Sequence, residues 1–341
     1  MQTHTDIESS ALVAAADVDG DYVGIVGRPG RLHGGAAVVT RISVGLVTAI
    51  AGGVLIVGAA SLAPAAGALP HLAPSQVGST AAHRPAAHKP AAKATFTDTF
   101  SGRVGAAPSR QWNVIDKTRP ATAWELESYR PAAAVMDGKG HLKITATRDA
   151  AGNWQSGRIE TAHDFAAGRK GKLRVSANIW LPAGGKGYWP AFWMLGSDIR
   201  TDPSAWPANG EIDVMEHLSG KEAASSHATL HCGKLSGGSC GGKNGLGRMY
   251  TTPDGSSLEK GFHRFDAELD QAAGTITWFI DGRAYHQVTR AHIGTKTWNQ
   301  ATAHGFYLIL NVAIGGWAGN PDKTTKSGAS MLVDDVSVYA S

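Results

Sequence analysis

The chain has 341 residues, of which 43% are hydrophobic and 18% charged, and its net charge is +4 at neutral pH. This composition excludes a chain that is disordered throughout, and the length allows one large domain or two ordinary ones. Lysine and arginine are interspersed with acidic residues and form no block, which argues against nucleic acid as a partner. The 43 glycines and 15 prolines favour turns and short strands over long helices.

The N-terminal part predicts an export segment. Residues 42–69 are almost wholly apolar and follow three arginines, a pattern typical of export signals. Ala66-Gly67-Ala68 suits signal peptidase, and the Gly/Ala content of the run favours cleavage, but the run is also long enough to anchor the chain in a bilayer. Residues 1–41 would then be an extended n-region or a cytoplasmic tail. In both cases the rest of the chain is expected outside the cell, secreted or tethered to the membrane.

Residues 70–94 predict a linker or cell-wall spacer. They are rich in alanine, proline, histidine and lysine and contain almost no large apolar side chain. The histidines at 71, 83 and 88 lack the spacing of metal ligands, so a solvated tether is the better interpretation. An ordered domain is expected over residues 95–341.

The ordered domain predicts short strands separated by turns. Because side chains on a strand alternate between two faces, alternating apolar residues indicate half-buried strands. Seven such runs lie at residues 96–100, 141–147, 157–161, 172–181, 275–280, 306–313 and 331–339. No segment shows a long helical period with caps. The pattern predicts one all-β domain, an antiparallel sandwich.

The stretch from Gly210 to His217 carries three carboxylates, Glu211, Asp213 and Glu216. On a regular strand Glu211 and Asp213 share a face and Glu216 points the other way. A β-bulge near Val214 and Met215 would return Glu216 to the same face, and bulges are frequent beside active sites. The alternative is a solvated strand edge. Since adjacent like charges are destabilising, the sequence favours a functional cluster of three acids.

Aromatic residues surround this stretch. Trp189 and Trp193 precede it, Trp206 lies just before it, and Trp317 follows later in the chain. Indole faces stack on pyranose rings while carboxylates bind hydroxyls, so this combination indicates a carbohydrate site. Trp189, Trp206 and Trp317 are the candidate sugar platforms, whereas Trp193 fits a core position equally well.

Two cysteines, Cys232 and Cys240, lie in a Gly/Ser-rich loop. In an exported protein this spacing predicts a disulfide that closes a short loop. The nearby His227 and His231 leave a Cys/His metal cluster as the weaker alternative.

Four segments together resemble glycoside hydrolase family 16, in its laminarinase-like endo-β-1,3-glucanase branch. They are WPAFWML at 189–195, GEIDVME at 210–216, and FYLILNVAIGG at 306–316 with MLVDDVSVY at 331–339. The resemblance covers residues 96–339. It implies a two-sheet jelly-roll sandwich, similar to concanavalin A, with a concave glycan cleft.

By this resemblance Glu211 is the nucleophile, Glu216 the acid/base, and Asp213 the residue that orients and tunes the nucleophile. Retaining hydrolysis needs two carboxyl groups about 5 to 5.5 Å apart, one ionised and one protonated. An anionic Asp213 should keep Glu216 protonated near neutral pH while Glu211 stays ionised. His231 takes the place of a cleft histidine that binds substrate. Arg158 would reach the cleft or form a strand-surface ion pair with Glu160.

The resemblance implies no required cofactor and allows a structural calcium ion with Asp334 as a ligand. The expected partner is a β-glucan, acted on by a secreted monomer. The leading hypothesis is hydrolysis of β-1,3-glucan or mixed β-1,3/1,4-glucan. Alternatives with the same mechanism are a β-galactan hydrolase, for agarose or carrageenan, and a transglycosylase. A lectin-like domain that binds glycan without cleaving it is the alternative outside enzymes, and three adjacent acids argue against it.

Overall fold

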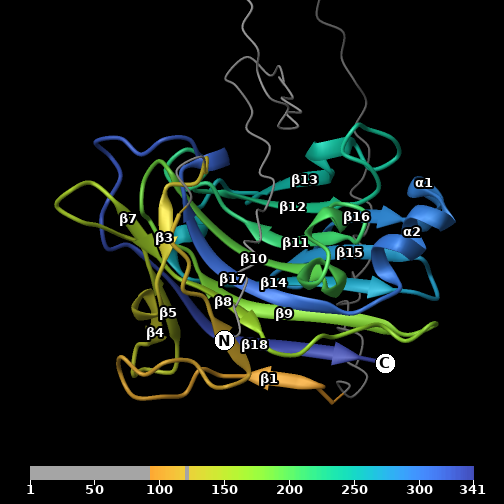
Figure 1. The fold of residues 1–341 in the computed structure, drawn as a ribbon, viewed down its shortest axis with the longest axis horizontal. Helices are drawn as coiled ribbons and strands as arrows, with labels where there is room; N and C mark the ends of the chain where they lie inside the picture. Colours follow the sequence, from red (N-terminus) through yellow and green to blue (C-terminus); the bar gives the residue numbers. More distant parts are fainter. Residues whose placement is uncertain (1–92, 120–122) are drawn as a thin grey trace, which may run out of the picture. The chain divides into compact units, whose positions relative to one another are not determined.

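A computed structural model describes residues 93–119 and 123–341 (Figure 1). The predictions made for residues 1–92, namely the export segment and most of the linker, lie outside these residues. None of the helices in the described part of the chain is long and apolar enough to cross a membrane.

One large sheet holds seven strands. They are β2 (Trp112–Val114), β8 (Arg158–Thr161), β10 (Tyr188–Gly196), β11 (Glu211–Glu216), β12 (Ser225–His231), β13 (Leu246–Thr251) and β17 (Phe306–Ile314). Their order across the sheet is β13-β12-β11-β10-β17-β8-β2, and neighbouring strands are antiparallel. The acidic stretch therefore forms β11, close to the middle of the sheet.

The other large sheet holds eight strands. They are β1 (Phe96–Asp98), β4 (Ala134–Met136), β5 (Leu142–Thr145), β9 (Lys172–Trp180), β14 (Phe262–Asp270), β15 (Thr275–Ile280), β16 (Arg283–Thr289) and β18 (Ser330–Ala340). The order is β16-β15-β14-β9-β18-β5-β4, and β1 pairs with β18. All of these pairs are antiparallel as well.

Smaller elements complete the domain. A minor sheet contains β3 (Glu127–Tyr129), β6 (Thr147–Arg148) and β7 (Trp154–Ser156), and β3 pairs with β7 in parallel. The helices are α1 (Arg290–Ile293) and α2 (Thr295–Thr302). Single 3₁₀ turns cover Pro131–Ala133, Ser197–Arg200, Pro203–Ala205, Gly242–Asn244, Leu258–Lys260 and Gly316–Ala318. In Figure 1 the two helices lie together at one end of the sandwich and the minor sheet at the other.

The core forms where the two large sheets face each other. Leu173, Val175, Ala177 and Ile179 alternate along β9 and are fully buried, as the period of two predicts. All residues of β17 are buried. One face of the strand meets the core, and the strand itself lies inside the seven-stranded sheet, with β10 on one side and β8 on the other. The all-β sandwich is thus confirmed, and each of the seven predicted runs contains a strand.

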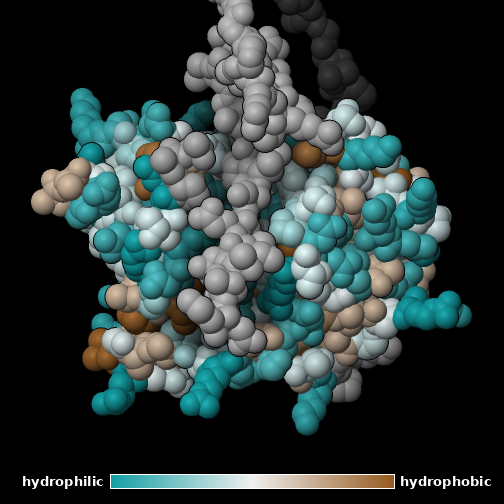
Figure 2. Space-filling model, in the orientation of Figure 1, coloured by the Kyte–Doolittle hydropathy of each residue, from teal (hydrophilic) through white to brown (hydrophobic). Residues whose placement is uncertain are grey.

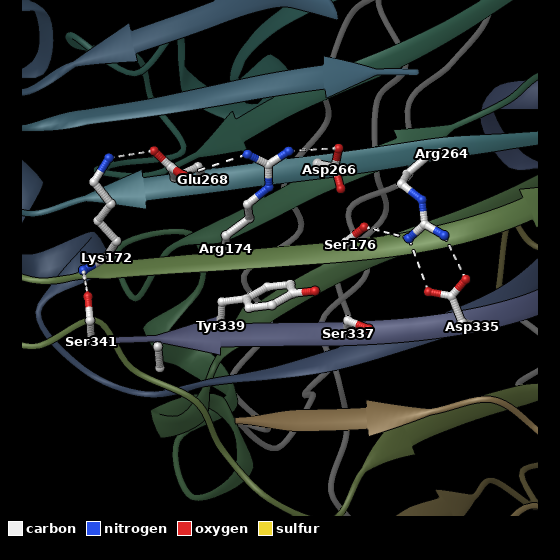
Figure 3. A pocket seen from close by; sticks show the side chains of 11 residues that line it. Lys172, Arg174, Ser176, Arg264, Asp266, Glu268, Asp335, Ser337, Tyr339 and Ser341 are labelled. Atoms are coloured by element: carbon white, nitrogen blue, oxygen red, sulfur yellow. Dashed lines mark hydrogen bonds and ion pairs between the residues drawn. The ribbon is translucent and has the colours of Figure 1, made fainter. Parts of the chain in front are cut away.

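The outer face of the eight-stranded sheet is polar. It borders a hollow of about 620 Å³ in which ion pairs cross from strand to strand, among them Lys172–Glu268, Arg174–Asp266 and Arg264–Asp335 (Figure 3). Basic and acidic groups therefore neutralise one another there. On the side of the molecule shown in Figure 2, hydrophilic side chains predominate on the coloured surface and apolar ones are scattered among them.

The predicted disulfide between Cys232 and Cys240 is present, with the Cα atoms 5.5 Å apart and both side chains buried. It follows β12 directly. We expect that replacing both cysteines by alanine lowers the free energy of unfolding by about 2 kcal/mol, because the short loop is no longer closed in the unfolded chain. Urea denaturation of the variant and of the oxidised native protein measures this difference. Equal midpoints and slopes would contradict it.

Candidate active site

The predicted β-bulge in β11 is confirmed. Against β10, Asp213 pairs with Trp193 and Met215 with Phe192, so Val214 has no partner there. Against β12, three steps from Asp213 to Glu216 match two steps on the partner strand. Val214 and Met215, although consecutive, are both fully buried in the main core cluster. The extra residue therefore turns Glu216 back to the face that carries Glu211 and Asp213. We call this side of the seven-stranded sheet the acidic face.

Gly210 fixes the start of β11. Its φ is +75°, a region that side chains rarely adopt, and a Cβ atom would lie 2.1 Å from the carbonyl oxygen of Ala301. Only glycine fits both conditions. The sharp entry of the chain at this point places Glu211 opposite Leu195 on β10 and opposite His231 on β12.

Each end of the acid cluster is held by an indole. The Nε1 atom of Trp206 donates to Oε2 of Glu211 at 3.1 Å, and the Nε1 atom of Trp189 donates to Oε1 of Glu216 at 3.0 Å. From the core side, Trp278 donates to the backbone oxygen of Asp213 at 2.8 Å. Because rigid side chains hold the carboxyl groups from both sides, the cluster is positioned before any ligand arrives.

Burial dominates the proton affinity of the three acids. It raises the pKa of Glu211 to about 7, with the charge of Asp213 adding to the effect and His231, Trp206 and Arg158 opposing it. The pKa of Glu216 is raised well above its usual value, first by burial and then by Asp213. Glu211 has the most exposed side chain of the three acids, and His231 and Trp206 oppose the rise of its pKa, so it is the acid that ionises first. A proton on Glu216 and an ionised Glu211 fit an acid and a nucleophile.

Burial also acts on Asp213, which the sequence predicts to be an anion. Only 5% of its surface is exposed, and this burial raises the pKa of Asp213 to about 8. Burial, more than the charge of Asp213, keeps Glu216 protonated.

The raised pKa of Glu211 predicts a pH-dependent stability. Below the unfolded value near 4.5, both states are protonated; as pH rises towards the folded value of about 7, the unfolded chain ionises and the native protein does not. The free energy of unfolding therefore falls between pH 4.5 and 7, and this one carboxyl group accounts for on the order of 3 kcal/mol of the fall. We expect the variant Glu211→Gln to escape this loss, so its advantage in free energy of unfolding grows between pH 4.5 and 7. Urea titrations at several pH values measure it; a constant difference, equal to that at pH 4, would contradict it.

The candidate tryptophans all lie around the acidic face. Trp317 is 46% exposed and packs edge-on against Trp189, with 6.0 Å between ring centroids. Trp193 pairs in register with Asp213 and donates from Nε1 to Oδ1 of Asn311 at 2.8 Å. Trp206 packs against His231 at 5.7 Å and also borders a hollow of about 510 Å³. The exposed ring of Trp317 marks the Glu216 end of the face, and Trp206 marks the Glu211 end.

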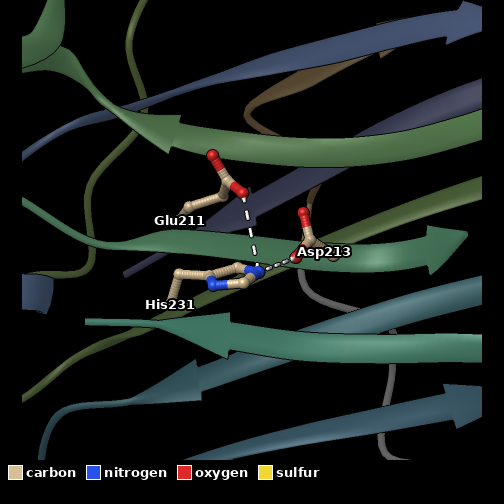
Figure 4. Close-up of side chains that lie close together, drawn as sticks. All are labelled: Glu211, Asp213 and His231. Carbon is tan, nitrogen blue, oxygen red and sulfur yellow. Dashed lines mark ion pairs between the residues drawn. The ribbon is translucent and has the colours of Figure 1, made fainter. Parts of the chain in front are cut away.

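The two basic candidates lie on opposite sides of the acids. The guanidinium of Arg158 is 5.0 Å from the ring centroid of Trp193 and binds Glu160 through Nε and Nη2 at 2.8 and 2.7 Å. Arg158 therefore makes the ion pair and also lies on the acidic face. The Nε2 atom of His231 is 3.4 Å from Asp213 and 3.8 Å from Glu211 (Figure 4).

Several residues of this face were not predicted as part of the glycan site, although His227 was considered as a metal ligand. Asn311 binds Trp193 and the hydroxyl of Tyr129, His227 packs against Trp317 at 4.6 Å, and Trp124 is 41% exposed and contacts Trp189. Asn311 had a visible signal, since it is the one polar residue of a nine-residue buried strand. His227, Tyr129 and Trp124 acquire their places only through strand register and loop packing.

Asp334 lies elsewhere, on β18 of the eight-stranded sheet. Its Oδ2 atom accepts a hydrogen bond from Asn178 at 2.9 Å. In the part of the chain that the structure describes, the one group of three or more acidic, histidine or cysteine residues with metal-like spacing is Glu211, Asp213 and His231. Asp334 does not belong to this group, and its role as a calcium ligand stays a prediction.

Known proteins share this fold and this site region. Residues 117–251 match the family model described as an XgeA-like, catalytic GH16 domain. The solved endo-1,3-β-glucanase of Streptomyces sioyaensis is 38% identical with a TM-score of 0.68, and the similarity covers 74% of this chain and 97% of that one. The chain belongs to glycoside hydrolase family 16. The predicted family, jelly-roll fold and glycoside hydrolase class are thus confirmed.

Two more similar proteins carry the name of an endo-1,3-β-glucanase or a glucan endo-1,3-β-glucosidase. The solved endo-β-1,3-glucanase of Pyrococcus furiosus is 34% identical with a TM-score of 0.62, over 73% of this chain and 94% of that one. Glucan endo-1,3-beta-glucosidase A1 of Niallia circulans is 32% identical over 270 residues, or 72% of this chain. The chain spans only 37% of the length of that relative.

Proposed function

We propose that the chain is an endo-acting, retaining β-1,3-glucanase that also accepts mixed β-1,3/1,4-glucan. The observation that carries the proposal is the bulge in β11, which brings Glu211 and Glu216 to one face between two indole donors. Similarity to endo-1,3-β-glucanases supports the choice of polymer.

The first chemical step breaks the glycosidic bond. The carboxylate of Glu211 attacks the anomeric carbon, while the proton of Glu216 passes to the oxygen of the leaving sugar. A covalent glycosyl ester on Glu211 results, and Glu216 is left ionised. In the second step Glu216 takes a proton from water, the hydroxide oxygen bonds to the anomeric carbon, and Glu211 leaves as a carboxylate. Two inversions give net retention.

The surrounding residues supply orientation. Trp206 donates to the oxygen of Glu211 that does not face His231, which directs the carboxylate. Trp189 donates to Glu216 and thereby stabilises its ionised form between the two steps. The reaction as written uses side chains of the chain alone. A structural calcium ion with Asp334 as a ligand stays a prediction and takes no part in these steps.

Location and assembly rest on the sequence. We place the enzyme outside the cell, secreted or tethered, because of the apolar run at 42–69 and the linker that follows. The disulfide fits an oxidising compartment. A monomer remains the expectation.

Product analysis tests the proposed function. The full chain is incubated with laminarin, lichenan, agarose and carrageenan, and NMR follows the anomer that forms first. We expect internal cleavage of laminarin, slower cleavage of lichenan, and β-anomers first. Cleavage of agarose or carrageenan alone would change the proposed substrate to a β-galactan. Products longer than the substrate would indicate a transglycosylase. Binding of laminarin with no release of new reducing ends would establish a lectin-like domain.

Trp317 offers a test of the sugar platform. We expect Trp317→Ala to raise the KM for laminarin about tenfold with a smaller change in kcat, because a stacking face at the Glu216 end is lost. The matched control is Trp180→Ala, which removes an indole of similar exposure, 38% against 46%, from the eight-stranded sheet. Equal KM values for the two variants would remove Trp317 from the binding surface.

A further inference from the structure

Three ligand-type atoms converge at the Glu211 end of the acidic face. Glu211, Asp213 and His231 each offer one ligand atom, and the three atoms lie within 4.8 Å of one another. Figure 4 shows the imidazole of His231 on β12 reaching across to both carboxyl groups on β11. The strand register produces this arrangement, because His231 is the direct partner of Glu211 and Asp213 follows on the same side.

His231 forms no hydrogen bond with Glu211 or Asp213, although the three side chains lie close together. The distances from Nε2 of His231, 3.8 Å to Glu211 and 3.4 Å to Asp213, are ion-pair distances with no hydrogen bond between the groups. Oδ2 of Asp213 is buried and accepts no hydrogen bond, and Asp213 as a whole is 5% exposed. A buried acceptor without a donor is costly unless something else binds it. The oxygen is therefore available to a ligand placed between the three side chains.

The spacing fits a small tetrahedral cation. Zinc binds histidine nitrogen and carboxylate oxygen at about 2.0 to 2.2 Å in a tetrahedral arrangement, which separates neighbouring ligand atoms by about 3.3 Å. The histidine nitrogen lies 3.4 and 3.8 Å from the two carboxylate oxygens, and the ligand atoms of the three residues lie within 4.8 Å of one another, so rotation of the side chains has to draw them together to reach this value. A nitrogen ligand and so few oxygens do not suit calcium or magnesium, which prefer six or more oxygens.

We propose that Glu211, Asp213 and His231 form a zinc-binding inhibitory site that is open when no glycan is bound. A zinc ion held by Oε1 of Glu211 occupies the lone pairs of the nucleophile and the space beside it. Glycan and zinc then exclude each other. This inference goes beyond the proposed function, and the binding of zinc can be measured whatever polymer the enzyme cleaves.

Zinc titration by calorimetry tests the site in the full-length chain. The variants are His231→Asn and, as the matched control, His227→Asn. His227 lies on the same strand and face but is paired with Glu222. Both variants lose one histidine, so any zinc bound by other histidines is equal in the two. We expect a site of micromolar Kd in the native chain and in His227→Asn, and at least tenfold weaker binding in His231→Asn. Unchanged zinc binding in His231→Asn overturns the proposal.

A second variant and a kinetic measurement guard against misfolding. Glu211→Gln removes another ligand and should also weaken zinc at least tenfold, while calcium at the same concentration should not occupy the site in any variant. In the native enzyme zinc should raise the apparent KM for the cleaved glycan and leave kcat unchanged. A fall in kcat at constant KM, or full zinc affinity in Glu211→Gln, would place the ion elsewhere and refute the assignment.

Discussion

Replacing Glu211 by glutamine is expected to lower kcat/KM on laminarin by at least about 10⁴-fold, because an amide cannot form the glycosyl ester. The side chain keeps its size, and Nε1 of Trp206 can still donate to the amide oxygen in place of Oε2. The loss would then report the missing nucleophile rather than a collapsed site. Reducing-sugar release under saturating and limiting laminarin measures kcat and kcat/KM.

The control for this prediction is Glu268→Gln, a carboxylate that is bound by Lys172 and lies on the eight-stranded sheet, whereas the proposed chemistry lies on the seven-stranded sheet. It should retain native kinetics. An activated 2-fluoro glycoside should leave a covalent sugar on the peptide that contains Glu211 in the native enzyme, and mass spectrometry would detect it. Substantial turnover by Glu211→Gln, or a sugar on another residue, would refute the role of Glu211.

The position of the acids could be predicted because local rules decide it. The spacing of Glu211, Asp213 and Glu216 conflicts with a regular strand, and a bulge is the smallest change that resolves the conflict. Strand positions followed from alternation in the same way, and β15 begins and ends at the predicted residues. The helix α2 was missed because it is short and polar, and the burial of Trp298 against the rest of the domain stabilises it.

The partners and charge states of the acids could not be predicted from local rules. The contact between Trp193 and Asn311 joins residues 118 positions apart. The protonation of Asp213 depends on how deeply the neighbouring strands bury it, which no residue spacing reveals. The sequence therefore predicts which groups react, whereas the structure shows the burial and the contacts that surround them.

Glu216→Ala is the second variant with a large expected effect. Without an acid, natural glycans with poor leaving groups should be cleaved at least about 10³-fold more slowly, whereas aryl glycosides with good leaving groups still form the ester on Glu211. Hydrolysis of that ester is then slow, because the variant lacks the base that activates water. Azide needs no base and fits the space left by the side chain, so added azide should restore turnover of the aryl glycoside.

The configuration of the azide product separates the two acids. In Glu216→Ala the azide displaces Glu211 from the ester, and two inversions give a β-glycosyl azide. In Glu211→Ala the azide replaces the nucleophile itself, and the single inversion gives an α-glycosyl azide. NMR of the two products distinguishes them. The bulge puts both acids on one face, so the geometry also allows Glu216 to be the nucleophile and Glu211 the acid/base. An α-azide from Glu216→Ala together with a β-azide from Glu211→Ala would establish this exchange of roles. We expect the opposite pair, since Glu211 has the more exposed side chain and Glu216 is an acid whose pKa burial raises well above its usual value.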